Sequence, residues 1–117
     1  MNIRGKLIII GGAVDKGSFT ETDLDRNAAK NLNFFEAGIL KRIINESKHK
    51  EQSRIEVITT ASKIPREIGP EYVKALHYLG ADNVDVLHIE RREQAVESEV
   101  LERLSNADVV MFTGGDQ

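Results

Sequence analysis

Apolar residues gather in four short runs along the chain. The runs are rich in Ile and Val and comprise Lys6–Ile10, Ile55–Thr60, Val84–Ile89 and Val109–Thr113. Two of them are nearly continuous rather than alternating, which is typical of strands that helices cover on both faces. The pattern therefore predicts four strands of a parallel sheet.

Between these runs lie three stretches with helical spacing. In the first, Phe35, Ile39 and Ile43 fall four apart, and Asn33 is the expected N-cap. The second is expected to have Pro70 in its first turn and Gly80 as its stop, because proline favours helix starts and glycine favours helix ends.

The third stretch ends near Asn106, and its apolar residues share one helical face: Val96, Val100, Leu101 and Leu104. Strands and helices thus alternate along the whole chain. This order predicts an α/β three-layer sandwich with a parallel sheet and right-handed crossovers. The segment from Ala13 to Leu32 does not fit, and it is expected to form either a short helix over Asp23–Asn31 or a functional loop.

Composition narrows the function classes. The chain has 117 residues, a net charge of −3 and no cysteine. The lack of cysteine excludes a thiolate nucleophile, a disulfide framework and a Cys-ligated metal, and weak acidity argues against nucleic-acid binding. The longest apolar stretch, Leu7–Val14, is too short to span a membrane, and no targeting signal is evident, so the sequence predicts a cytoplasmic protein.

Small, polar and charged residues follow each predicted strand. In an open α/β sheet, ligands bind outside the carboxyl ends of the strands. Here those ends carry Gly11–Lys16, Thr60–Lys63, Glu90–Arg92 and Gly114–Gln117, two of which hold double glycines that let backbone approach a ligand. We expect a site at this edge.

Familiar catalytic motifs do not complete that site. Ser18 stands where a phosphate-binding loop needs lysine, and no Gly-x-Gly-x-x-Gly occurs. The histidines are too scattered to predict a metal site. Ser62 lacks the flanking glycines of a nucleophile elbow, so a turn or helix cap is the expected role.

Taken together, the strand-end motifs resemble the cyanophycinases, in the serine peptidase family that also holds the aspartyl dipeptidases. The resemblance covers nearly the whole chain. It rests on Leu7–Lys16, Ile58–Pro65 and Phe112–Gln117, with Tyr72–Ala81 and Val86–Ile89 between them. Val14 departs from the pattern, since an acidic residue is more usual there.

The resemblance implies a class I glutamine amidotransferase-like (flavodoxin-like) sheet and a cofactor-free, homodimeric serine hydrolase. Its substrate would be a polymer of aspartate with arginine branches, cut to β-aspartyl-arginine dipeptides. The serine would sit on a Gly-Thr-Ser-Ala-Gly-type elbow after the next strand, beyond Gln117. The chain is then expected to be the N-terminal part of one α/β hydrolase domain, inactive alone.

Acyl transfer also needs donors for the oxyanion. We expect the Gly115 N–H to be one, with Gly114 shaping the turn. Asp116 and Gln117 would line the substrate cleft, and Asp15 and Lys16 are weaker candidates for substrate binding. Two alternatives stay open: a small flavodoxin-like module that binds an anion or nucleotide without catalysis, and a non-catalytic partner completed by a second polypeptide.

Overall fold

The computed structural model describes residues 5–10 and 38–114. Its elements are α2 (Ile39–Glu46), β1 (Ile55–Ile58), α3 (Pro65–Tyr78), β2 (Val84–Val86), α4 (Ser98–Asn106) and β3 (Val109–Phe112), with short 3₁₀ helices η2 (Lys50–Gln52) and η3 (Arg92–Val96). The three strands form one parallel sheet in the order β2-β1-β3. The predicted α/β class with a parallel sheet is confirmed.

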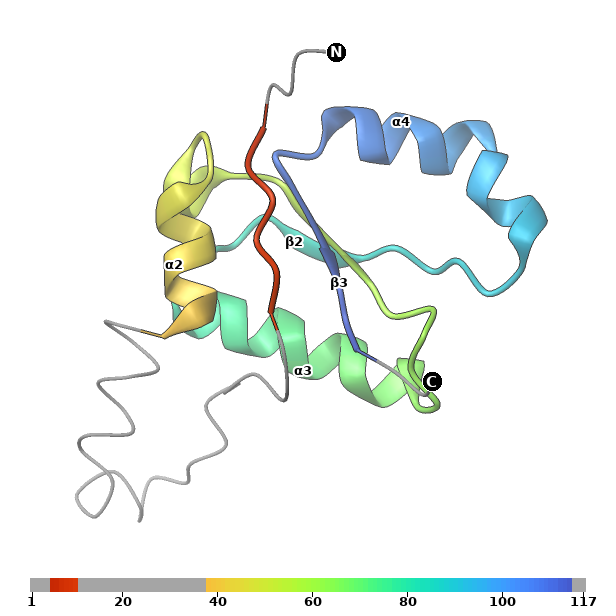
Figure 1. Ribbon diagram of the computed structural model, residues 1–117, viewed down its shortest axis with the longest axis horizontal. Coiled ribbons are helices and arrows are strands. Elements are labelled where there is room, and N and C mark those ends of the chain that lie inside the picture. Colours follow the sequence, from red (N-terminus) through yellow and green to blue (C-terminus); the bar gives the residue numbers. More distant parts are fainter. Residues whose placement is uncertain (1–4, 11–37, 115–117) are drawn as a thin grey trace.

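Helices lie on both faces of the sheet (Figure 1). On one face, α2 and α3 pack against Ile55 and Val57 of β1 in the larger apolar cluster. On the other face, Val100 of α4 packs against Ile58 and Leu87. Alternate residues of β1 thus enter opposite layers, as the pleat of a strand requires.

The prediction of a strand over Lys6–Ile10 is wrong, because the structure assigns no strand there. Leu7 and Ile9 are 86% and 87% exposed, whereas Ile10 packs against the larger apolar cluster. Lys6 pairs with Glu46 of α2, so the segment is held by a side-chain contact with that helix and not by strand pairing. An apolar run becomes a strand only where a neighbouring strand accepts its backbone hydrogen bonds.

Helix α3 begins earlier than predicted. Pro65 occupies its first turn and Pro70 lies inside it. Either proline suits a helix start. The Ser62 N–H donates to the Thr59 carbonyl and closes the turn after β1, so the chain is ready to begin the helix at Pro65. The predicted stop is confirmed: Gly80 has φ +101°, a conformation that favours glycine.

The other boundaries follow the predictions with smaller differences. Helix α4 ends at Asn106 as expected, but Val96 belongs to η3 and is 73% exposed, and Leu101 is also exposed. The cap at Asn33, Phe35 and the Asp23–Asn31 helix lie outside the described residues. Within those residues, none of the helices is both long and apolar enough to cross a membrane.

Candidate functional site at the carboxyl ends of the strands

The carboxyl ends of β1 and β3 bring two buried threonines to one edge of the sheet. Ile58 is in register with Phe112, and the Thr113 N–H donates to the Ile58 carbonyl at 3.0 Å. Continuing that register places Thr59 beside Thr113. Thr59 is 2% exposed and Thr113 is 6% exposed. The two threonines are therefore polar groups shielded from solvent, whereas Thr60 and Gly114 after them are exposed.

The Thr113 hydroxyl is the unusual group here. Its Oγ1 is buried and has no hydrogen-bond partner among the described residues. A buried hydroxyl without a partner costs free energy, so such a group in a native site is a candidate for binding a ligand or a neighbouring segment. Gly114 follows directly, and a Cβ built there meets no atom of the described residues within 4 Å. The backbone after β3 is thus open to close approach.

The loop after β1 is fixed by its own hydrogen bonds. Thr60 Oγ1 donates to the Ile89 carbonyl at 2.6 Å, which ties this loop to the segment after β2. The Ile64 N–H donates to Ser62 Oγ at 3.1 Å. Ser62 therefore serves the turn before α3, as predicted, and its hydroxyl is engaged with backbone.

Most of the predicted site residues lie outside the described residues. These are Gly115, Asp116, Gln117, Asp15 and Lys16, so their roles stay predictions. Gly114 is described and lies at the expected strand end. In the described part of the chain, no serine or threonine hydroxyl is hydrogen-bonded to a histidine or carboxylate base. No group of three or more potential metal ligands occurs there either.

The three histidines lie on different elements of the structure. His77 is on the exposed side of α3, and His88 is exposed after β2. His49 Nδ1 lies 3.2 Å from Asp108 Oδ1. Asp108 also accepts a hydrogen bond from the Arg54 N–H at 2.9 Å, and this bond, with the nearby His49, lowers the pKa of Asp108 below its usual value of 3.8.

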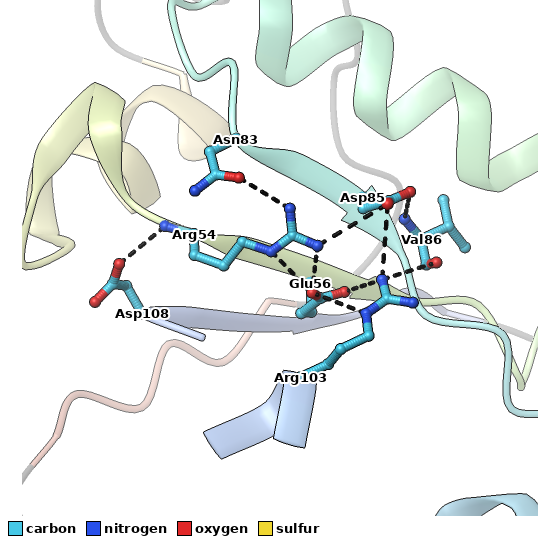
Figure 2. Close-up of polar contacts among 7 residues, drawn as sticks. All are labelled: Arg54, Glu56, Asn83, Asp85, Val86, Arg103 and Asp108. Atoms are coloured by element: carbon cyan, nitrogen blue, oxygen red, sulfur yellow. Dashed lines mark hydrogen bonds and ion pairs between the residues drawn. The ribbon is translucent and has the colours of Figure 1, made fainter. Parts of the chain in front are cut away.

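A buried ion network lies beneath α4 (Figure 2). Glu56, in the centre of β1, is 0% exposed, and its two oxygens accept hydrogen bonds from Arg54 and Arg103 at 2.5–3.2 Å. The hydrogen bond with Glu56 raises the pKa of Arg103. Because both carboxylate oxygens are engaged, Glu56 is suited to holding α4 on the sheet rather than to acid–base chemistry.

Asp85 joins this network to the outer edge of β2. Its Oδ2 lies 3.9 Å from Arg103 and 4.0 Å from Arg54, and its Oδ1 accepts a hydrogen bond from the Val86 N–H (Figure 2). Arg103 also donates to the Val86 carbonyl at 3.3 Å. The outward backbone groups of Val86 are thus satisfied within the chain.

The described residues also line a groove that the sequence did not indicate. It is a cavity of about 640 Å³ between α3 and the outer side of β2, and its lining comprises Arg66, Pro70, Val73, Asp85, Val86, His88 and Glu90. The sequence could have placed residues 66, 70 and 73 on one face of a helix by their spacing. It could likewise have placed residues 86, 88 and 90 on one face of a strand by their alternation. Only the tertiary packing brings the two sets together.

The described residues define an α/β protein with an open parallel sheet, and the candidate site lies at the carboxyl ends of its strands. The sequence is similar to curated cyanophycinases. Those of Trichormus variabilis and of Nostoc sp. are each 40% identical over 63 residues, 54% of this chain and 21% of each relative. The cyanophycinase of Geminocystis herdmanii is 28% identical over 115 residues, 98% of this chain and 36% of that protein.

No family model matches the chain. The chain spans about a third or less of the length of these relatives. The matches support a relation to the cyanophycinases.

Proposed function

We propose that the chain is the N-terminal portion of a cyanophycinase-like serine exopeptidase. Such an enzyme would hydrolyse an aspartate and arginine storage polymer to β-aspartyl-arginine dipeptides. The observation that carries the proposal is the similarity to three cyanophycinases, one of which matches 98% of this chain. Among the described residues, the backbone at Gly114 is open and the neighbouring Thr113 hydroxyl has no partner, which agrees with a site at that strand end.

The proposed chemistry divides the catalytic groups between two parts of the polypeptide. A serine on a Gly-x-Ser-x-Gly elbow, after a strand encoded beyond Gln117, would attack the scissile carbonyl. The Gly115 N–H would donate to the oxyanion that forms. Asp116 would face a cationic arginine branch and Gln117 the substrate backbone, with Asp15 and Lys16 bordering the same cleft. We also propose that this enzyme is a homodimer and acts in the cytoplasm.

A direct test is hydrolysis by the full-length protein. The coding sequence downstream of Gln117 is read first, and a strand followed by the elbow is expected. Purified cyanophycin is then incubated with the protein, and β-aspartyl-arginine is measured by mass spectrometry. Replacing the elbow serine with alanine should abolish release. A stop codon at that point, or release that survives the serine substitution, would overturn the proposal.

The oxyanion role of Gly115 has its own test. Gly115→Pro removes the N–H and should lower kcat about 10²–10³-fold, as loss of an oxyanion donor does. Gly115→Ala keeps the N–H and serves as the matched control. Equal losses in both variants would point to a disturbed turn instead of a lost donor.

The competing binding-module interpretation makes a different prediction. A flavodoxin-like anion site would raise the Tm in phosphate or nucleotide, because ligands stabilise the state that binds them. A Tm shift together with no hydrolysis of cyanophycin would favour it over the peptidase.

A further inference from the structure

The Thr113 side chain is held on one face of the sheet by the pairing of β3 with β1. Its N–H donates to the Ile58 carbonyl at 3.0 Å, which fixes the backbone at this position. Because side chains alternate along a strand, Thr113 shares the face of Val109 and Met111. That face carries the larger apolar cluster, in which Met111 is buried. The hydroxyl thus lies at the polar end of an otherwise apolar row.

The burial of this hydroxyl limits what can bind it. Thr113 is 6% exposed, and its Oγ1 has no hydrogen-bond partner among the described residues. Thr59, which the register places beside it, is only 2% exposed. A substrate that diffuses in from solvent meets exposed groups first. A segment that folds together with Thr113, in contrast, can bury its own polar groups against the hydroxyl.

Without a partner, the hydroxyl is unfavourable for the described fold. A buried donor without an acceptor costs free energy, and valine has nearly the same shape without that cost. The four residues before Thr113, which form β3, are all apolar. Thr60 shows the ordinary arrangement, since its Oγ1 donates to the Ile89 carbonyl at 2.6 Å. The Thr113 hydroxyl is therefore expected to have a partner outside the described residues.

The position of β3 in the sheet indicates where this partner lies. β3 is at one end of the strand order β2-β1-β3. Successive residues of a parallel strand direct their backbone groups to opposite sides, so Phe112 presents its N–H and carbonyl to the outer edge while Thr113 pairs with β1. The chain covers 36% or less of the length of the curated relatives. A further segment of a longer polypeptide that pairs at this edge would lie next to Thr113.

We propose that Thr113 is a positioning residue of the candidate site. Its hydroxyl donates a hydrogen bond to a backbone carbonyl of the segment that adds beside β3 in the longer polypeptide. This bond fixes the backbone at Gly114 relative to that segment, and Thr113 itself touches neither the substrate nor the reacting atoms. The inference rests on the proposed function, because a nucleophile on the added segment must be aligned with the backbone after β3. A misplacement of about 1 Å can lower a rate about 10²-fold.

Kinetics of cyanophycin hydrolysis by the full-length protein test this role. Thr113→Val removes the hydroxyl and keeps the shape, so it should lower kcat by about tenfold or more and leave KM nearly unchanged. Thr113→Ser keeps the hydroxyl and should retain most of the wild-type kcat. Val109→Ala, at the other end of β3 and on the same face, is the control: it should lower stability and leave kcat unchanged.

Urea unfolding of the same full-length variants shows whether the hydroxyl has a partner, independently of hydrolysis. Thr113→Val should lower the urea midpoint, and Thr113→Ser should largely restore it, because removing a hydroxyl leaves its acceptor buried and unpaired. A midpoint that is unchanged or raised in Thr113→Val would overturn the inference. Equal losses of kcat in the valine and serine variants would also overturn it, because the loss would then follow the methyl group.

The two measurements separate this inference from the proposed function. Wild-type hydrolysis that persists at full kcat in Thr113→Val would overturn the positioning role alone. If the wild-type protein does not hydrolyse cyanophycin, the proposed function fails. In that case a lowered midpoint in Thr113→Val, restored in Thr113→Ser, would still uphold the hydrogen bond of Thr113.

Discussion

Glu56 is a carboxylate placed in the middle of the central strand, where every neighbouring position of β1 is buried. Its charge is tolerated because Arg54 and Arg103 hydrogen-bond both of its oxygens. Arg103 is 47 residues away in sequence. A local pattern therefore shows the strand and misses the ion network that fastens α4 to it.

Removing this carboxylate should be costly. Glu56→Ala leaves two partly buried guanidinium groups without their partner, so we expect a loss of about 3–5 kcal/mol in the free energy of unfolding, measured in urea. Replacing both Glu56 and Arg103 with leucine should cost less than Glu56→Ala alone, because an apolar pair leaves fewer charges buried. Glu102→Ala, on the exposed side of α4, is the control, and an equal loss there would refute the argument.

Asp108 makes stability depend on pH. Its pKa is lowered in the folded protein by the Arg54 N–H and by His49. A group with a lowered folded pKa stabilises the protein above its unfolded pKa, and this contribution is lost as the pH falls through the folded value.

Asp108→Asn keeps an acceptor for the Arg54 N–H but removes its charge, so it should destabilise the protein at pH 7 by about 1 kcal/mol, the usual difference between a charged and a neutral hydrogen bond. The difference from wild type should shrink as the pH falls below 3.8, the usual value for this group. Urea titrations from pH 7 to pH 2.5 measure it, with the exposed Asp82→Asn as reference. A difference that is constant over this range would contradict the assignment.

At the scale of elements, α3 is positioned by close packing at one glycine. A Cβ at Gly69 would lie 2.8 Å from Val86 Cγ2, and Val86 is only 8% exposed. This contact sets how near α3 comes to β2, and it therefore sets the width of the groove beside them.

Gly69→Ala should destabilise the protein by about 1–3 kcal/mol through overpacking, despite the better helix propensity of alanine. Val86→Ala alone should also destabilise, because it leaves a cavity. The double variant should lose less than the sum of the two, since alanine at 69 then fills space that valine vacated. Additive losses in urea unfolding would show that the two side chains do not share this space.

The sequence predicted the three strands of the described residues because each run carries apolar residues; in β1 these are Ile55 and Val57 on one face and Ile58 on the other. The run at Lys6–Ile10 has the same pattern, and it fails because pairing partners are set by the tertiary fold. The early start of α3 was missed since Pro65 and Pro70 both satisfy the rules for a first turn. Gly114 follows a strand as predicted, and its role at a site stays a prediction. The groove depends on a helix stripe and a strand stripe that meet only in the folded chain.

At the scale of the whole molecule, the sheet is covered unevenly. β3 lies at one end of the order β2-β1-β3, so its outer edge has no strand beside it among the described residues. On the side facing α4, Phe112 is 73% exposed and Val110 is 38% exposed, because α4 packs over β1 and the chain after β2 instead. An unpaired edge with exposed apolar side chains favours pairing between chains.

We therefore expect the 117-residue polypeptide to self-associate as its concentration rises, and Phe112→Lys to shift it toward monomer, because a lysine on an edge strand opposes pairing. Sedimentation velocity over a hundredfold range of concentration measures this. Val96→Lys is a closely matched control, since Val96 is also 73% exposed but lies on η3, away from the sheet edge. If Val96→Lys were as effective as Phe112→Lys, association would follow total exposed apolar surface. If only Phe112→Lys acts, the contact is the edge of β3.

The same edge is where the proposed enzyme would add the strand that leads to its serine elbow. In the full-length protein, Phe112→Lys should therefore lower hydrolysis and stability together, whereas Val96→Lys should leave both unchanged.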